Sequence, residues 1–379
     1  MTRKVNASEF FLASMLVFFI SILNLGVLPL GLFLIFSGIL LAYGRFLSSV
    51  SSYIFLFFFF LFLSYGYIFK VVNPLDVGYT ATYIYCFLCF VGFSIFNDYS
   101  TVDKIKILRF VIQIHCFALF SQSLVYLLTS KYIDLHYIIT FFTYESRYES
   151  SSLSFLNVAR STGFSIEPSN AAAVITYLNL VYLIFKGKVD RFFIISQLFT
   201  LLTLSFASIA VSVGIVISSL LYFSHREGRV RLFLGAVLLS FTLGFLAIFI
   251  ITWRLEDAVD YDAIGYRMVI FSYFNNANIY ELIFGQGIHI FNTPTFFNNV
   301  LLNSSNIRDP GLLVNILFSF GFLGVMAIFL LLYFLSSNVL VFFVVIFCLI
   351  LKFDYMQPIF WFAIFSMISY KVSSLVRFR

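Results

Sequence analysis

The sequence predicts an all-α integral membrane protein, built as one polytopic helical bundle. Three observations support this fold class. The chain of 379 residues is 61% apolar and only 11% charged, whereas soluble domains typically carry about a quarter charged residues. Apolar runs long enough to cross a bilayer recur along the whole chain. These runs, such as "YIFLFFFFLFLSYGYIF", are apolar on every side and do not alternate as barrel strands do.

Hydropathy divides this single membrane domain, residues 1–379, into about 12 transmembrane helices. The expected spans are 10–24, 26–43, 53–70, 77–96, 107–128, 168–186, 191–206, 207–223, 231–252, 311–334, 338–352 and 356–371. Because the turns inside 10–43, 191–223 and 338–371 are weakly marked, ten or eleven spans are an alternative. The first apolar run lacks a small-residue cleavage site and is interpreted as a retained span.

The distribution of charge predicts that both termini lie in the cytoplasm. In that orientation, 15 of the 23 basic residues are inside, in agreement with the positive-inside rule. They are Arg3, Lys4, Arg45, Lys104, Lys106, Arg109, Lys186, Lys188, Arg191, Arg226, Arg229, Arg231, Lys371, Arg377 and Arg379. Because these basic residues sit in short loops, they indicate topology, and nucleic acid is not an expected partner.

Two long loops, at about 129–167 and 253–310, are then expected on the outer face. Long loops in a compact protein are usually functional. The first loop ends in "RSTGFSIEPSNAAAVI", residues 160–175. The second begins "TWRLEDAVDYDAIGYRMVIFSYF", and its amphipathic patches predict that it folds back onto the membrane surface.

The end of the first loop carries charge at the start of an apolar span. Pro168 suits the first position of a helix and disfavours a helical conformation at Glu167, which places Glu167 at the outer entrance of span 168–186. Gly163 permits a turn between Arg160 and Glu167. Since helix N-termini attract anions, a phosphate group is expected here. The alternative is that Arg160 and Glu167 pair with each other and only anchor the loop.

Arginine dominates the basic residues that are expected on the outer face. They include Arg147, Arg160, Arg254, Arg267 and Arg308. A guanidinium group binds two phosphate oxygens at once. The composition of the outer loops therefore predicts a pocket of converging arginines that suits a pyrophosphate group attached to a lipid.

Two further motifs lie in or after the second loop. "FGQGIHIF", residues 284–291, sets His289 beside two glycines. That histidine is either a structural turn residue or a base or hydrogen-bond donor to a ligand. "RDPGLL" places Arg308 and Asp309 before Pro310 at the start of a span, where Asp309 either caps the helix or contacts a substrate.

The four cysteines do not predict a metal site or a disulfide framework. Cys86, Cys89, Cys116 and Cys348 all fall inside apolar runs, where a free thiol behaves as a small hydrophobic group. The CxxC formed by Cys86 and Cys89 has no partner pair and is interpreted as coincidence. No metal and no cofactor are expected.

At these motifs the sequence resembles the Wzy-type O-antigen polymerases, which are related to the O-antigen ligases. The resemblance lies in "RSTGFSIEPSNAA", in "YRMVIFSYF" with "ELIFGQGIHIF", in "RDPGLLVNILFSFGFLG", and in the layout of many spans with two sizeable outer loops. It implies a GT-C-type glycosyltransferase of the bacterial inner membrane with its site facing the periplasm. Such an enzyme serves lipopolysaccharide biosynthesis by joining oligosaccharide repeat units linked to undecaprenyl pyrophosphate. The implied partners are these lipid-linked oligosaccharides, membrane lipids and a chain-length regulator protein.

The resemblance also suggests roles for individual residues. Arg160 and Arg267, with Arg254 or Arg308, would neutralise the departing pyrophosphate. Glu167 would take the proton from the acceptor hydroxyl, and His289 is the second candidate for that base. The other expected substrate contacts are Arg147, Asn170, Tyr266 and Asp309.

Two other functions remain as alternatives. A ligase would transfer the finished glycan to lipid A-core, but "NSSNIRDPG" lacks the His–Asn pairing expected of that branch. A flippase or transporter would carry ionisable residues at mid-membrane and internal repeats, whereas here the charges collect at the outer ends of the spans.

Overall fold

The computed structural model describes residues 5–22, 27–42, 91–140, 142, 144–147, 159–227, 263–287, 295–302, 307, 309–352 and 357–377. These residues are predominantly helical, and the strands among them form one short hairpin. The chain divides into two compact units. The first comprises residues 1–58, 81–212 and 356–379, and the second comprises residues 59–80 and 213–355.

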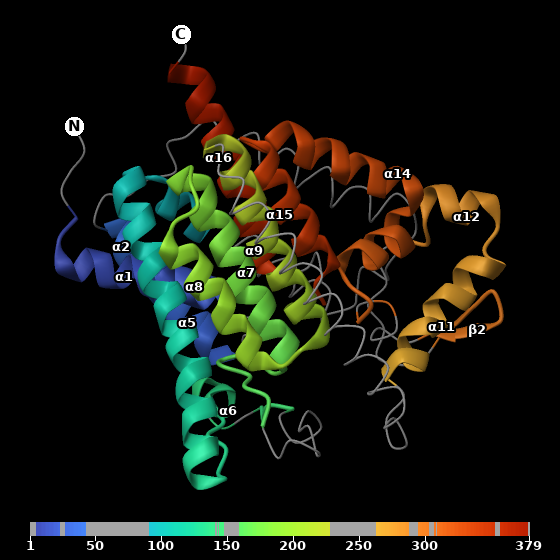
Figure 1. Cartoon of the computed structure of the whole chain (residues 1–379), viewed down its shortest axis with the longest axis horizontal. Coiled ribbons are helices and arrows are strands. Elements are labelled where there is room, and N and C mark those ends of the chain that lie inside the picture. Colours follow the sequence, from blue (N-terminus) through green and yellow to red (C-terminus); the bar gives the residue numbers. More distant parts are fainter. Residues whose placement is uncertain are drawn as a thin grey trace. The chain divides into compact units, whose positions relative to one another are not determined.

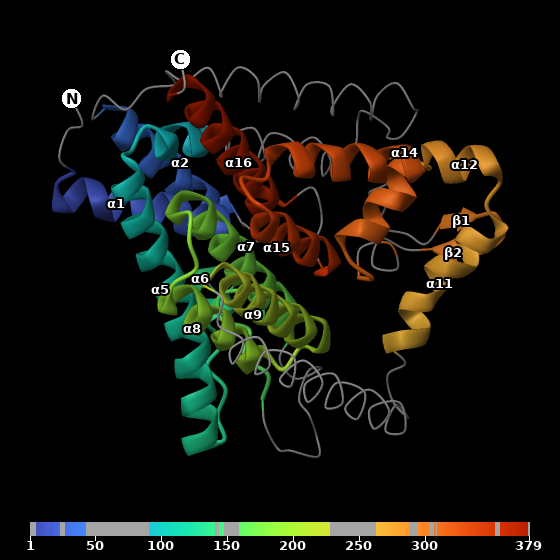
Figure 2. The ribbon, with the colours of Figure 1, turned by 45° about the horizontal axis from the view of Figure 1, so that its top comes forward.

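The first unit is a bundle of helices from both ends of the chain. It contains α1 (Ala7–Ser21), α2 (Val27–Ala42), α5 (Thr101–Thr129), α6 (Leu135–Ile139), α7 (Pro168–Lys186), α8 (Arg191–Phe199), the 3₁₀-helix η2 (Thr200–Thr203) and α16 (Pro358–Arg377). Helix α7 packs against α5, α8, η2 and α16, and α1 packs against α2 and α5 (Figures 1 and 2). The long helix α5 therefore lies beside the central helix α7.

Side-chain caps start four helices of this unit, α1, α5, α6 and α8. Asn6, Ser100, Asp134 and Asp190 each accept a hydrogen bond from the backbone N–H three residues later, which satisfies one of the unpaired donors at a helix N-terminus. Helix α7 begins at Pro168 after an extended Glu167, as the sequence predicts. It ends where Gly187 adopts a positive φ of 70°, a conformation that glycine adopts without strain.

Helix α7 is the core of the first unit, and its polar side chains are paired inside it. Its apolar span is 89% buried, compared with 39% for α5. The amide Nδ2 of Asn179 donates to Oε1 of Gln197 at 3.0 Å, and Nε2 of Gln197 donates to the hydroxyls of Thr176 and Ser212 at 2.9 Å each. These buried amides are thus hydrogen-bonded between helices, as polar groups inside a membrane protein must be.

The segment after α7 is shorter than the predicted span 191–206. Helix α8 continues as η2 and stops at Leu204, which has a left-handed φ of 47°. The helical stretch Arg191–Thr203 is therefore shorter than the described helices that can cross a membrane. At its end, the backbone carbonyls of Leu202 and Thr203 accept hydrogen bonds from Ser161 and Arg160 in the loop before α7.

The second unit combines apolar helices with the folded part of the loop at about 253–310. It contains most of α9 (Phe206–Glu227), and α11 (Ala263–Asn276), α12 (Ile279–Phe284), β1 (Thr295–Phe297), β2 (Val300–Leu302), α14 (Leu312–Leu335) and α15 (Val339–Ile350). The strands pair antiparallel with Phe296 opposite Leu301. The buried core around them consists of Ile270, Tyr273, Leu302, Ile307 and Phe318. The loop therefore has its own hydrophobic core, which the sequence does not predict.

Helix α14 is interrupted at Gly321, where the backbone of the "GQG" turn packs against it. Gly321 has φ +63° and ψ −165°, outside the helical region. The backbone N–H groups of Gln286 and Gly287 donate to the carbonyls of Phe318 and Ser319 at 2.8 Å each. The break in α14 thus exchanges hydrogen bonds within the helix for hydrogen bonds to this turn.

Three of the described helices are long and apolar enough to cross a membrane, namely α5, α7 and α14. Shorter apolar helices occur at Ala7–Ser21, Arg191–Thr203, Ala207–Tyr222, Val339–Ile350 and Pro358–Ser373. The chain thus has the helical character expected of a membrane protein. Predicted spans 53–70 and 231–252 and most of 77–96 lie outside the described residues, and the number of twelve spans stays a prediction.

Candidate functional site

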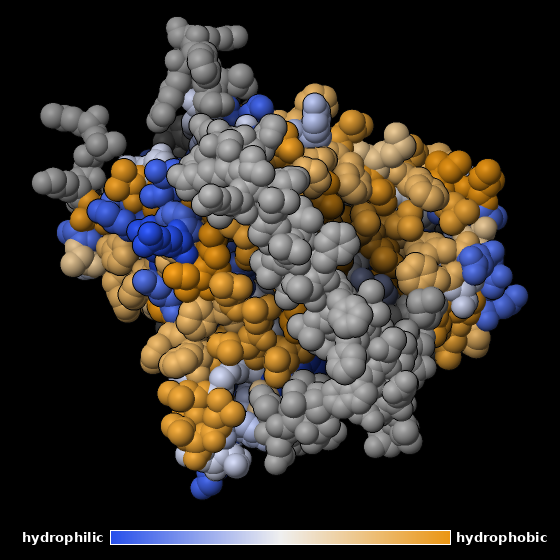
Figure 3. Space-filling model, in the orientation of Figure 1, coloured by the Kyte–Doolittle hydropathy of each residue, from blue (hydrophilic) through white to orange (hydrophobic). Residues whose placement is uncertain are grey.

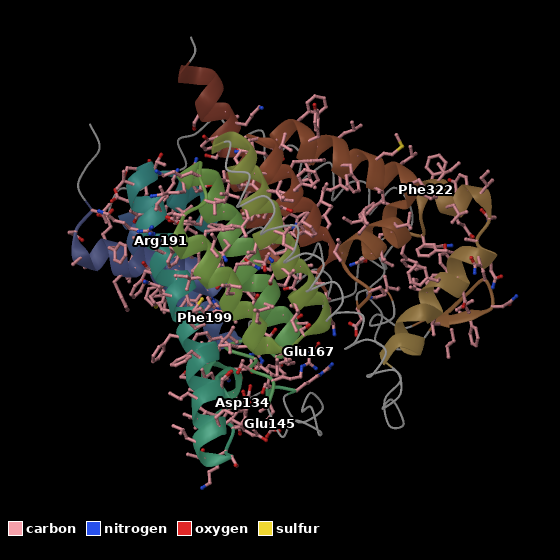
Figure 4. All side chains as sticks on the ribbon, viewed as in Figure 1. Asp134, Glu145, Glu167, Arg191, Phe199 and Phe322 are labelled. Atoms are coloured by element: carbon pink, nitrogen blue, oxygen red, sulfur yellow. The ribbon has the colours of Figure 1, made fainter. Side chains whose placement is uncertain are left out.

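The candidate site is built around residues 160–167, which we call the site segment. The segment joins the first outer loop to α7. Figure 4 shows Glu167 at the same end of the first unit as Asp134 and Glu145, whereas Arg191 lies at the opposite end. The segment is held on one side by α5 and the loop around α6, and on the other side by the end of η2.

The turn of the site segment is fixed by the side chain of Gln122 on α5. Its Oε1 accepts hydrogen bonds from the backbone N–H groups of Thr162 at 3.1 Å and Gly163 at 2.7 Å. Its Nε2 donates to the carbonyls of Gly163 at 3.3 Å and Ile133 at 2.9 Å. The predicted turn at Gly163 is confirmed by its φ of +56°.

The loop around α6 adds three contacts to the same turn. The hydroxyl of Tyr132 accepts from the N–H of Thr162 at 3.1 Å and contacts the Thr162 hydroxyl at 2.7 Å. Burial raises the pKa of Tyr132 to about 12, and its hydrogen bonds to Thr162 offset only part of this effect. Nδ1 of His136 lies 2.9 Å from the carbonyl oxygen of Phe164. Because a carbonyl only accepts, this nitrogen carries the proton.

Arg160 contacts the end of η2 and is half-buried. Its Nε donates to the carbonyl of Thr203 at 3.3 Å, and the neighbouring Ser161 N–H donates to the carbonyl of Leu202 at 3.4 Å. A cation at the C-terminal end of a helical segment is favourable because the carbonyls there carry partial negative charge. Arg160 is thus anchored beside the break between η2 and α9.

Glu167 forms an ion pair with Arg147. Nη1 of Arg147 lies 2.8 Å from Oε1 of Glu167, and the exposed fractions of the two side chains are 66% and 16%. In addition, the backbone N–H of Arg147 donates to the carbonyl of Ile166 at 2.8 Å. Arg160 and Glu167 lie on the same segment, and Glu167 pairs with Arg147, which lies twenty residues earlier in the chain.

Asn170 lies in the first turn of α7, close to Glu167. Its backbone N–H donates to the carbonyl of Glu167 at 3.1 Å, and its side chain is half-buried. Of the predicted site residues, the structure therefore brings Arg147, Glu167 and Asn170 together at the N-terminal end of α7, and Arg160 lies on the site segment that leads into this end.

The remaining predicted site residues belong to the second unit. Asp309 forms an ion pair of 3.1 Å with Lys352, and both side chains are largely buried, at 18% and 17% exposed. Arg267 and Tyr266 lie on α11, and their side chains are not among the described ones. Arg254, His289 and Arg308 lie outside the described residues. The convergence of the arginines thus stays a prediction.

Gly285 of the "GQG" turn and Gly321 of α14 lie where the turn packs closely against the helix. A side chain at Gly285 would come within 2.5 Å of the backbone carbon of Ser319, and one at Gly321 within 2.3 Å of the carbonyl oxygen of Ile283. The group that approaches the backbone of Gly285 is therefore helix α14.

Chemically, the N-terminal end of α7 and the segment before it offer a carboxylate, two guanidinium groups and an amide. Among the residues that the structure describes, no group of three or more His, Cys, Asp or Glu side chains is arranged to hold a metal ion. The residue set suits recognition of an anion and removal of a proton from a hydroxyl.

The residues that the sequence analysis missed are Gln122, Tyr132 and His136. In the sequence, Gln122 is a polar residue near the C-terminal end of the otherwise apolar helix α5, and Tyr132 and His136 follow in the next loop. This pattern is the one feature that could have indicated them. No protein-family model matches the chain, and neither a curated protein nor a solved structure matches it.

Proposed function

We propose that this protein is a membrane-embedded O-antigen polymerase that joins oligosaccharide repeat units linked to undecaprenyl pyrophosphate on the outer side of the membrane. The proposal rests on the resemblance in "RSTGFSIEPSNAA". The observation that carries it is the arrangement of this stretch as a buried turn, with Arg160 before it and the Arg147–Glu167 pair after it.

In this mechanism the acceptor hydroxyl attacks the anomeric carbon of the growing glycan. The bond from that carbon to the pyrophosphate oxygen breaks, and undecaprenyl pyrophosphate departs with the bonding electrons. Glu167 takes the proton of the hydroxyl. Arg160 stabilises the charge that develops on the pyrophosphate. Because the leaving group is already activated, the reaction needs no nucleotide sugar.

An apolar groove next to the site segment also supports a lipid-linked substrate. It has a cavity volume of about 370 Å³ and runs along α5, where Phe117 and Ala118 line it. Leu135 and Phe164 also line it, so the groove meets the site segment at Phe164. Figure 3 shows that hydrophobic residues cover much of the described surface, with a hydrophilic area near the starts of α5 and α8. A groove at this depth suits a hydrocarbon chain.

A gel-based genetic experiment tests the proposed function. Deletion of the gene should collapse the ladder of surface polysaccharide to core bearing a single repeat. Bare core would instead identify a ligase, and an unchanged ladder would contradict both enzymes.

A flippase is the second candidate, and the interrupted helix α14 is the observation in its favour. Broken helices in transporters expose backbone groups that bind substrates and ions. In α14, however, the carbonyls of Phe318 and Ser319 are already occupied by the "GQG" turn. Lipid-linked repeat units that are lengthened by the purified protein would decide for the polymerase, because a flippase moves single units unchanged.

Replacement of Glu167 tests its role as the base. We expect Glu167→Gln to reduce the polymerisation rate about 10²- to 10⁴-fold, the range for removal of a general base. The assay uses purified protein with lipid-linked repeat units. Glu145→Gln is the matched control, because Glu145 is an exposed acid in the same loop. Substantial activity of Glu167→Gln would reduce Glu167 to an anchor for Arg147.

A further inference from the structure

The amide group of Gln122 is used completely by the backbone of the first outer loop. A primary amide offers two acceptor lone pairs and two N–H donors. The two acceptor positions of Gln122 are filled by the N–H groups of Thr162 and Gly163, and its donors face the carbonyls of Gly163 and Ile133. The side chain is only 1% exposed. Its contacts are therefore not shared with solvent.

The turn of the site segment requires such a partner. Gly163 has φ +56°, and a side chain there would come within 3.2 Å of Leu119, so the turn is pressed against α5. The backbone N–H groups of Thr162 and Gly163 point to Gln122. A buried backbone donor without an acceptor destabilises the fold, and the acceptor of the Gly163 N–H is the side-chain oxygen of Gln122.

The two charged residues of the site segment, Arg160 and Glu167, lie on opposite sides of this turn in the sequence. Arg160 lies three residues before Gly163, and Glu167 lies four residues after it. Arg160 is tied to the end of η2 and Glu167 to Arg147. A rotation of the peptide at Gly163 would change the distance between the side chains of Arg160 and Glu167. The contact with η2 fixes only Arg160, and the ion pair with Arg147 fixes only Glu167.

We propose that Gln122 is a positioning residue, which sets the placement of Arg160 relative to Glu167 by holding the Thr162–Gly163 backbone against α5. This inference deepens the proposed polymerase function and rests on it. Gln122 touches neither charged residue. It acts through the backbone of Thr162 and Gly163. Tyr132 and His136, from the loop around α6, contact the same turn.

Two substitutions separate positioning from simple packing. Gln122→Met keeps the length of the side chain and removes all four hydrogen bonds. Gln122→Glu keeps the shape and leaves a group whose hydrogen bonding depends on protonation. The neutral carboxyl group accepts from both N–H groups through one oxygen and donates through the other to Gly163 or Ile133. The ionised group would place a negative oxygen beside two carbonyl oxygens, which repel it.

The expected results follow from this difference. Gln122→Met should lower kcat/KM for lengthening of lipid-linked repeat units by about 10²-fold at every pH, the size expected for a small displacement of catalytic groups. Gln122→Glu should approach wild-type activity at low pH and fall to the level of Gln122→Met as pH rises. Because burial raises the pKa of a carboxyl group above about 4.3, this decline should lie within the working pH range.

Leu124→Met is the matched control. Leu124 is an exposed residue on the same helix, two residues from Gln122, and it lies outside the residues that line the apolar groove. We expect its substitution to leave kcat/KM unchanged. A wild-type kcat/KM in Gln122→Met, or a pH profile of Gln122→Glu that parallels the wild type, would overturn the inference while the proposed function stands.

A measurement without substrate keeps the inference testable if the wild-type protein does not lengthen glycans. Backbone amide exchange of Gly163 should be at least about ten-fold faster in Gln122→Met than in the wild type and in Leu124→Met, because the Gly163 N–H loses its acceptor, whereas the Thr162 N–H keeps the Tyr132 hydroxyl. Equal exchange in all three proteins would overturn the inference. Absence of glycan lengthening by the wild type would overturn the proposed function alone.

Discussion

At the residue scale, three buried amides of the first unit are held by hydrogen bonds, and two ion pairs of this unit lie at the ends of α7. Gln122, Asn179 and Gln197 are at most 1% exposed and are hydrogen-bonded to backbone or side chains. An amide both donates and accepts without the large cost of burying a charge. The ion pair of Arg147 with Glu167 instead lies where α7 begins.

The ion pair at the other end of α7 predicts a pH-dependent stability. Asp190 is hydrogen-bonded to Tyr182 at 2.7 Å and to Arg109 at 2.8 Å. Partial burial opposes its ionisation, but the hydrogen bonds from Tyr182, the Phe193 N–H and Arg109 outweigh this, and the pKa of Asp190 is lowered. A lowered pKa stabilises the fold above the unfolded pKa, and this contribution is lost as pH falls through the folded pKa.

Asp190→Asn isolates this contribution, because asparagine still caps α8 as well as aspartate does. We expect a loss of about 1 kcal/mol at pH 7, limited by solvent screening since Arg109 is 42% exposed. The melting temperature in detergent measures it. The difference from wild type should shrink below about pH 4, where aspartate becomes protonated. A difference that stays constant with pH would show that the charge of Asp190 contributes nothing.

At the element scale, the contact between the "GQG" turn and α14 depends on two glycines. Because an added Cβ would overlap backbone atoms at 2.5 Å or less, Gly285→Ala and Gly321→Ala should each destabilise the protein by roughly 3 kcal/mol or more. Gly38→Ala is the control, since nothing lies within 4 Å of its added Cβ. Thermal unfolding followed by size-exclusion chromatography checks this. Unchanged melting of both glycine variants would mean that the turn and α14 separate without cost.

Helix positions could be predicted from the sequence, but interruptions within them could not. Pro168 and Gly187 mark both ends of α7, and hydropathy predicts its length. The left-handed Leu204 and the break at Gly321 could not be predicted in this way. Hydropathy averaged over a window contains no information about the φ angle of a single residue. The placement of Glu167 at a helix start followed from local rules.

The partners in the candidate site could not be predicted for a related reason. Gln122 meets Gly163 from forty-one residues away, and Arg147 meets Glu167 from twenty residues away. Caps and turns depend on neighbours within a few residues, whereas these contacts depend on how α5 packs against α7. A single sequence contains no local signal for such pairing.

At the scale of the whole molecule, the first unit has chemically different ends, and this asymmetry predicts its orientation. Lys106, Lys188 and Arg191 are exposed at the end where α8 begins. Asp134, Glu145 and Glu167 lie at the other end (Figure 4). Basic residues are retained on the cytoplasmic side of a membrane. The candidate site should therefore face the periplasm.

Cysteine labelling in intact cells tests this orientation. Cys116 and Cys348 are buried, so a protein with Cys86 and Cys89 replaced by serine should react little with a membrane-impermeant maleimide. In that background, Glu145→Cys should be labelled from outside, whereas Lys188→Cys should be labelled only after the cells are opened, because both positions are exposed but lie at opposite ends. The reverse pattern would place Glu167 and Arg160 in the cytoplasm. Lipid-linked repeat units on the periplasmic side would then be out of their reach, and the proposed polymerase would be excluded even though every contact of the site segment remained as described.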